Sequence, residues 1–310
     1  MPKKLEHVLS VKQLMDTDLL DELFFAALQY EKDDATRAAR VTLSGRVLAT
    51  MFYEPSTRTR FSFEAAMLRL GGAVLTAENA MENSSAAKGE SIADTVRVIG
   101  GYADAIVMRH FERGAIQEAA SASPVPMINA GDGAGEHPTQ ALLDVYTIRK
   151  ELGRLNDLHV AVIGDLKNGR TVHSLLPLLS LYPGLHVTLI APPSLRLPEE
   201  YMEQLRARGV TLEETEDFGG EALRAADVVY MTRVQRERFG SDAEYDAVKA
   251  VYVLTEHIAD ELKPEAIILH ALPRLQELPA GVDRNLRAAY FRQAKNGLHM
   301  RMALLAYLLS

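Results

Sequence analysis

The sequence contains no cysteine, and it has no apolar run long enough to cross a membrane. The absence of cysteine excludes disulfides, thiolate zinc sites and a cysteine nucleophile, and it is typical of a cytoplasmic protein. The most apolar segment, residues 298–309, is too short to span a bilayer. No apolar stretch of signal-peptide length follows the basic residues near the N-terminus. The sequence therefore predicts a cytoplasmic protein with no membrane partner.

Basic residues are outnumbered, because 34 lysines and arginines stand against 42 aspartates and glutamates, giving a net charge of −8. This balance argues against a nucleic-acid partner or an anionic membrane surface. A binding site for an anion must then be a local cluster of arginine and lysine within an acidic molecule. No His-Glu-x-x-His run or other metal-ligand cluster is present, so we expect no metal site.

Short apolar segments alternate with helical stretches along the whole chain, which is long enough for two ordinary cores. This alternation predicts an α/β protein with two domains, each a parallel sheet flanked by helices. Residues 154–158 are expected to link the two halves. The predicted strands cover residues 47–51, 105–108, 125–129, 160–163, 187–190, 228–231, 251–254 and 267–269.

The densest group of anion-binding side chains lies in residues 52–61, which read Phe-Tyr-Glu-Pro-Ser-Thr-Arg-Thr-Arg-Phe. Pro55 ends the preceding strand, so a helix is expected to begin within residues 56–59. The unpaired N–H groups and the positive dipole of a helix N-terminus favour an anion, and arginine suits phosphate oxygens. The alternative is an ordinary capped helix with solvated arginines, but a cap needs one hydroxyl and not three.

Other polar groups also follow predicted strands, where ligands collect in open α/β sheets. Arg109 ends one strand, and residues 131–140 form a glycine-rich turn that contains His137 before a helix beginning at Pro138. Residues 164–171 come close to a nucleotide-binding P-loop, but arginine replaces its lysine and Asp165 would lie beside the phosphates. Polar residues also follow the strands that end at 231 and 269.

These motifs together resemble the transcarbamoylase family. Residues 52–60 are similar to its carbamoyl-phosphate signature, and Glu54-Pro55 resembles the aspartate branch. Residues 131–140 and 164–174 match further family motifs in order. Residues 270–274 read His-Ala-Leu-Pro-Arg where the family commonly has His-Pro-Leu-Pro-Arg, and they lack the cysteine typical of the ornithine branch. The resemblance covers nearly the whole chain.

The resemblance implies carbamoyl transfer from carbamoyl phosphate to the amino group of L-aspartate, a step of pyrimidine synthesis, without a cofactor. It implies a carbamoyl-phosphate domain at 1–137, onto which a C-terminal helix at about 291–310 packs back, and an aspartate domain at 138–290, joined by interdomain helices. It also implies a homotrimer with active sites shared between subunits, and it leaves open whether regulatory or other pathway chains bind.

The resemblance further assigns the site residues. The catalytic residues would be Arg58, Thr59, Lys88, Arg109 and His137. Carbamoyl phosphate would be bound by Ser56, Thr57, Arg58, Thr59, Arg109, His137, Gln140 and Ser84, with Ser85 replacing Ser84 in another loop register. L-aspartate would be bound by Lys88, Arg170, Arg233, Gln235 and Leu272, the last through its backbone carbonyl.

Three alternatives to this function remain open from the sequence. The chain could be a carbamoyltransferase for another amine such as ornithine, a P-loop-like nucleotide-binding protein, or a phosphate-binding module without activity.

Overall fold

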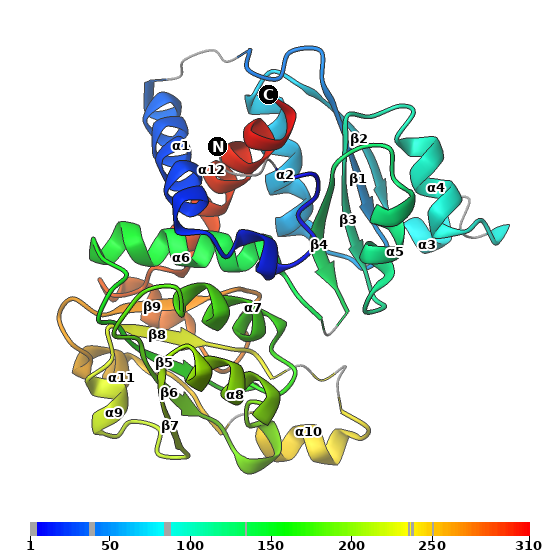
Figure 1. The fold of residues 1–310 in the computed structure, drawn as a ribbon. Helices are drawn as coiled ribbons and strands as arrows, with labels where there is room; N and C mark the ends of the chain where they lie inside the picture. The colour runs from blue at the N-terminus through cyan, green and yellow to red at the C-terminus, as the bar shows by residue number, and fades with distance from the viewer. Residues whose placement is uncertain are drawn as a thin grey trace. The chain divides into compact units, whose positions relative to one another are not determined.

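The computed structural model describes residues 5–36, 41–83, 88–133, 135–234, 236, 239–249 and 251–310. These residues form two compact units (Figure 1). Unit 1 comprises Met1–Leu143 with Lys295–Ser310, and unit 2 comprises Asp144–Ala294. The domain boundary expected at residues 137/138 lies at the start of a helix, whereas the compact units divide six residues further along it. Residues 154–158, the expected link, lie within unit 2.

Unit 1 is built on a parallel sheet of four strands in the order β2-β1-β3-β4. Alternate residues of β1 and β3 pack with α4 and α5 in one apolar cluster, so these helices cover one face of the sheet (Figure 1). The strands are β1 (Val47–Phe52), β2 (Ala73–Glu78), β3 (Ala105–His110) and β4 (Met127–Asp132), and the helices are α1 (Thr17–Thr36), α2 (Thr57–Arg69), α3 (Ala80–Asn83), α4 (Ile92–Ile99) and α5 (Ala115–Ala122).

Two helices have residues in both units, namely α6 (Pro138–Leu152) and α12 (Tyr290–Leu309). Within unit 1, the C-terminal part of α12 is fixed by polar contacts. The imidazole Nε2 of His299 lies 3.1 Å from the carboxylate of Asp34, and the Arg301 guanidinium lies 5.0 Å from the centre of the Phe63 ring. Segments far apart in the sequence therefore share the unit 1 core.

Unit 2 contains a parallel sheet of five strands in the order β7-β6-β5-β8-β9. Buried residues of β5, β8 and β9 form one apolar cluster with residues of α9 and α11. The strands are β5 (His159–Ile163), β6 (His186–Ile190), β7 (Thr211–Thr215), β8 (Val228–Met231) and β9 (Ile267–His270), and the helices are α7 (Arg170–Leu179), α8 (Glu199–Ala207), α9 (Glu221–Arg224), α10 (Asp242–Val248) and α11 (Glu256–Glu261).

The predicted fold class, two parallel sheets flanked by helices, is confirmed. The strand predicted at residues 251–254 is wrong, because this segment is irregular: the N–H group of Leu254 donates 2.9 Å to the carbonyl of Glu277 in a loop. The prediction also missed β2 and β7. Both are edge strands with mostly exposed or half-buried side chains, so neither carries the apolar run of an interior strand.

A carboxylate joins the beginnings of β5 and β8 in unit 2. Asp227 accepts hydrogen bonds from the backbone N–H of His159 at 2.9 Å and the ammonium of Lys263 at 2.9 Å, and it pairs with Arg154 at 3.1 Å. Burial acts to raise the pKa of Asp227, but the N–H donor and the two cations lower it more, so that the net pKa lies below its ordinary value. The folded state therefore favours the ionised carboxylate.

We predict that Asp227→Asn lowers the free energy of unfolding by about 1–2 kcal/mol near neutral pH, because the two cations lose their anionic partner. A depressed folded-state pKa stabilises the fold above the unfolded-state pKa, and this contribution is lost as pH falls through the folded-state pKa. Urea unfolding at a series of pH values should therefore show the two proteins converging in acid. Glu203→Gln, at an exposed position in α8, is the control, and a difference that does not change with pH would contradict the prediction.

Candidate functional site

In unit 1, the predicted anion-binding residues lie at the carboxyl edge of the sheet. Phe52, the last residue of β1, is in register with Arg109 near the end of β3. Strand order runs from β1 to β2 on one side and from β3 to β4 on the other, so the loops that follow β1 and β3 leave in different directions. Ligands of open α/β sheets bind at such a switch point. The structure thus places Arg109 beside the loop that leads into α2.

The first turn of α2 differs from the other capped helices. Ser56 occupies the N-cap position, but its side chain makes no capping hydrogen bond. By contrast, Ser91, Ser241 and Thr255 each cap their own helix through the side-chain oxygen. The unused cap leaves the Ser56 hydroxyl and the first N–H groups of α2 available to an anion. Thr57 and Arg58 are exposed and Thr59 is buried on this turn.

Arg109 is 8% exposed and is oriented by two acceptors. One guanidinium nitrogen donates to the carbonyl of Ala130 at 3.3 Å, and the other lies 2.8 Å from the carboxylate of Glu54. Glu54 comes from the loop after β1, and the backbone N–H of Tyr53 in the same loop donates to the Arg109 carbonyl at 2.9 Å. Side-chain and backbone bonds therefore hold this arginine in place at the sheet edge.

The second arginine of the motif does not join the anion turn. Arg60 pairs with Glu78 on β2 at 2.7 Å and lies 3.8 Å from Glu64. Arg60 lies within the predicted anion-binding segment, residues 52–61, but its guanidinium is engaged in structural ion pairs. Burial lowers the pKa of His110 despite the nearby glutamates, which disfavours the cationic form of its ring. Arg58, which is exposed on the first turn of α2, and the buried Arg109 bring positive charge to this edge.

The glycine-rich turn before α6 places the remaining predicted residues of unit 1. His137 is buried directly before the helix, and Gln140, which is 9% exposed, lies one turn later. The carboxylate of Asp132 accepts from the N–H of Glu136 at 2.7 Å, which closes the turn. Lys88 is exposed, whereas Ser84 and Ser85 lie outside the described residues.

In unit 2, three loops leave the sheet side by side. Ile163, Met231 and His270 are neighbours in register at the ends of β5, β8 and β9. Gly164 follows β5 with φ +110°, and a Cβ there would lie 2.6 Å from the carbonyl oxygen of Thr232. Only glycine allows this close approach of the two loops. The strand order changes direction between β5 and β8, so this edge is again a switch point.

The predicted residues of unit 2 lie on these three loops. Arg170 is the first residue of α7 and is half-buried, and Arg233 is half-buried just after β8. Leu272 follows β9 with φ +55°. Gln235 lies outside the described residues. The arrangement brings two guanidinium-bearing loops to one sheet edge, which suits a ligand with carboxylate groups.

The loop at 164–170 is not a phosphate cradle. Asp165 is fully buried, and its carboxylate accepts from the backbone N–H of Asn168 at 2.9 Å and from the Asn168 amide at 3.2 Å. A nucleotide-binding loop turns its N–H groups toward phosphate, whereas here a carboxylate occupies that position. This contact argues against the P-loop alternative.

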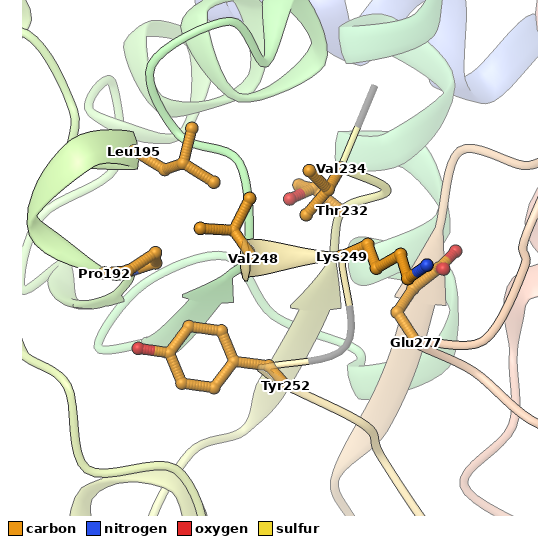
Figure 2. A pocket seen from close by; sticks show the side chains of 9 residues that line it. Pro192, Leu195, Thr232, Val234, Val248, Lys249, Tyr252 and Glu277 are labelled. Atoms are coloured by element: carbon orange, nitrogen blue, oxygen red, sulfur yellow. The ribbon is translucent and has the colours of Figure 1, made fainter. Parts of the chain in front are cut away.

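A pocket of unit 2 joins the loops after β5, β8 and β9 (Figure 2). Its empty volume is about 250 Å³ with open solvent included, and it is lined by Gly164, Pro192, Leu195, Thr232, Val234, Val248, Lys249, Tyr252 and Glu277. Most of these side chains are apolar. The exception that matters is the buried Glu277. Because it lines the same pocket as Gly164 and Thr232, it lies next to the loops that carry the predicted contacts to the amino-acid substrate.

Sequence reasoning gave no role to Glu54 or Glu277. Glu54 lies inside the anion-binding segment, more than fifty positions before Arg109 in the sequence. Their ion pair therefore becomes visible only from the register of the strands. Glu277 lies seven residues beyond His270, outside any motif, and only folding brings the two side chains together.

Among the described residues, no three His, Asp or Glu side chains are grouped to hold a metal ion. In the same part of the chain, no helix combines the length and apolarity needed to cross a bilayer.

Comparison with known proteins gives a consistent result over both units. Residues 6–150 match the model "Aspartate/ornithine carbamoyltransferase, carbamoyl-P binding domain", and residues 156–308 match "Aspartate/ornithine carbamoyltransferase, Asp/Orn binding domain". The chain is 50% identical to the chloroplastic aspartate carbamoyltransferase of Arabidopsis thaliana over 99% of its length and 78% of that protein. It is also 50% identical to the aspartate carbamoyltransferase catalytic subunit of Methanothrix thermoacetophila, covering 99% of both.

Among solved structures, the chain is similar to aspartate transcarbamoylase from Trypanosoma cruzi in complex with carbamoyl phosphate and aspartate. The TM-score is 0.93 at 41% identity, over 98% of this chain and 97% of that one.

The unused cap at Ser56 generates a prediction. Ser56→Ala should change the free energy of unfolding by less than about 0.5 kcal/mol, because no capping bond is lost. Ser91→Ala, the matched control, should cost about 1 kcal/mol because Ser91 caps α4. Conversely, calorimetric titration with inorganic phosphate should show weaker binding for Ser56→Ala and unchanged binding for Ser91→Ala. If Ser56→Ala destabilises the protein as Ser91→Ala does and binds phosphate normally, the hydroxyl is a cap and not a ligand.

Proposed function

The chain belongs to the aspartate/ornithine carbamoyltransferase family, and we propose that it transfers the carbamoyl group of carbamoyl phosphate to L-aspartate. The products are N-carbamoyl-L-aspartate and phosphate, a reaction of pyrimidine synthesis. The observation that carries this proposal is the uncapped start of α2 at the switch point of the unit 1 sheet, with Arg109 in register beside it. That arrangement suits a phosphate group, and both relatives named above are aspartate carbamoyltransferases by name.

In the proposed mechanism, the aspartate amine attacks the carbamoyl carbon, and the bond from that carbon to the phosphate oxygen breaks. The amine loses a proton and the departing phosphate takes it up, so that phosphate leaves as the hydrogen phosphate dianion. No side-chain nucleophile is needed, so the protein acts by positioning the reactants and stabilising developing negative charge. Both tasks call for fixed donors and cations rather than for a reactive residue.

Unit 1 supplies the groups for carbamoyl phosphate in this proposal. Ser56, Thr57, Arg58, Thr59 and Arg109 bind the phosphate, and Ser84 from the neighbouring subunit adds a contact. Thr59, Arg109 and His137 polarise the carbamoyl oxygen, while Gln140 holds the carbamoyl amide. The burial of Arg109 and His137 supports these roles, because donors in a water-poor site stabilise an oxyanion more strongly.

Unit 2 supplies the groups for L-aspartate. Arg170 and Arg233 each pair with one carboxylate, Gln235 and Lys88 add contacts, and the backbone carbonyl of Leu272 accepts from the amine. The side-by-side exit of the loops after β5, β8 and β9 supports this assignment. An ornithine acceptor would place an ammonium group where the second carboxylate lies, next to a guanidinium, and like charges would repel.

We further propose that residues 1–137 with 291–310 act as the carbamoyl-phosphate domain and residues 138–290 as the aspartate domain.

The protein assembles as a homotrimer in which Lys88 reaches the neighbouring subunit's site. Exposed apolar side chains of unit 1 support a protein interface, namely Phe61 and Leu68 on α2 and Leu75 on β2. That regulatory or other pathway chains bind the trimer as additional partners stays a prediction. So does a cytoplasmic location, since several plant relatives are named chloroplastic.

The first test is phosphate release from carbamoyl phosphate, with L-aspartate and L-ornithine offered in parallel and no metal or ATP added. We expect turnover with aspartate alone, because Arg170 and Arg233 match two carboxylates. Turnover with ornithine instead would overturn the assigned acceptor and the roles of both arginines. Absence of turnover with either amine would leave phosphate binding as the supported function.

The shared site is tested with hybrid trimers. Arg58→Ala should lower kcat by orders of magnitude, because a clamp on the leaving phosphate is lost, and Lys88→Ala should also inactivate the enzyme. When the two inactive proteins are dissociated, mixed and reassembled, each mixed trimer regains one intact site, so phosphate release should reappear. Each variant reassembled alone is the control. If the mixture stays as inactive as the controls, Lys88 acts within its own subunit.

A further inference from the structure

The loop that follows β9 has a backbone conformation that needs support. Leu272 adopts φ +55°, in the left-handed region that a leucine rarely occupies. Such a residue costs about 1–3 kcal/mol and persists only where the surrounding structure holds it. The preceding position is Ala271, which has no ring to restrict the chain. The contacts that fix this loop must therefore come from other residues.

Two buried side chains at the ends of the loop hold its backbone. The N–H group of Leu272 donates to Nδ1 of His270 at 2.8 Å, and the N–H group of Leu275 donates to Oε1 of Glu277 at 2.9 Å. The two side chains are themselves joined, because Nε2 of His270 lies 3.0 Å from the same Oε1. His270 is 3% and Glu277 is 5% exposed, so water does not compete for these bonds.

The donors settle the protonation of the imidazole. Because Nδ1 of His270 accepts from a backbone N–H, it carries no proton, and the neutral ring therefore donates from Nε2 to the Glu277 carboxylate. Burial acts to raise the pKa of Glu277, but the hydrogen bond from His270 and those from backbone N–H groups lower it below its ordinary value. The pair thus consists of a neutral histidine and an ionised glutamate, each with a fixed role toward the loop.

Further buried groups anchor this pair to the core of unit 2. The backbone N–H of His270 donates to the Gln293 amide oxygen at 2.9 Å. The Gln293 amide nitrogen donates to Asp144 at 2.6 Å, and the Tyr230 hydroxyl donates to the other oxygen of Asp144 at 2.8 Å. These three side chains are at most 1% exposed. A continuous chain of hydrogen bonds therefore connects β8, α6 and α12 to the loop.

We propose that His270 and Glu277 are positioning residues that hold the Leu272 carbonyl in place for the amine of the amino-acid substrate. This inference rests on the proposed function, which assigns that carbonyl to aspartate. Neither side chain is proposed to touch the substrate. Glu277 also lines the pocket that joins the loops after β5 and β8 (Figure 2), so a shift of the loop would change its distance to the other amino-acid contacts.

The test uses Glu277→Ala, Glu277→Gln and the control Glu265→Ala, an exposed glutamate just before β9. In phosphate-release assays, Glu277→Ala should raise KM for aspartate by about tenfold or more, because a small misplacement of a substrate contact is costly. The KM for carbamoyl phosphate should stay within about twofold. Glu277→Gln keeps an oxygen acceptor for both donors and should recover most of the loss. The control should behave as the wild type.

A second measurement does not depend on turnover. Amide hydrogen exchange at Leu272 and Leu275 should be faster in Glu277→Ala than in the wild type, and restored in Glu277→Gln. Unchanged exchange, an unchanged KM for aspartate, or an equal rise of both KM values would overturn the inference. A wild-type protein without turnover would refute the proposed function, whereas the exchange rates would still decide whether Glu277 holds the loop.

Discussion

The alignment of parallel strands is the constraint on which the rest of this structure depends. In a parallel sheet all carboxyl ends lie at one edge, so the loops that follow different strands meet there even when they are far apart in the sequence. Each of the two sheets changes its direction of winding once, between β1 and β3 in unit 1 and between β5 and β8 in unit 2. The loops diverge at those pairs, and they carry the predicted ligand residues 56–59 and Arg109 in unit 1 and Arg170 and Arg233 in unit 2.

Electrostatics then separates binding groups from structural ones within an acidic chain. Arg60 is used in ion pairs with Glu64 and Glu78, while Arg58, two residues earlier, is exposed at the helix start. Arg109 is buried, and Glu54 offsets its charge and orients it. The net negative charge of the protein therefore coexists with a local positive site, and several other arginines of the described residues pair with nearby carboxylates on the surface.

Buried polar groups supply the rigidity that such a mechanism requires. A reaction without a side-chain nucleophile depends on how accurately the substrates are held. A series of hydrogen bonds links five residues, namely Tyr230, Asp144, Gln293, His270 and Glu277. These bonds satisfy the main polar atoms of the five residues, so the network is stable although it lies in the core. Its last members hold a strained loop, and strain of this kind is common beside ligand sites.

The sequence alone determined the interior strands, the start of α2 and the motif positions, because these depend on local patterns: apolar runs, a proline that ends a strand, and hydroxyls at a helix start. Ala105–Met108 and Val228–Met231 are examples, since their apolar residues need no partner to be recognised. Only the tertiary structure decided the edge strands β2 and β7, whose side chains are largely exposed, and the irregular course of residues 251–254. It also decided that Arg60 pairs with Glu78 on β2, that Glu54 meets Arg109 and that Glu277 meets His270. Such pairings depend on strand order and loop geometry, which no local pattern encodes.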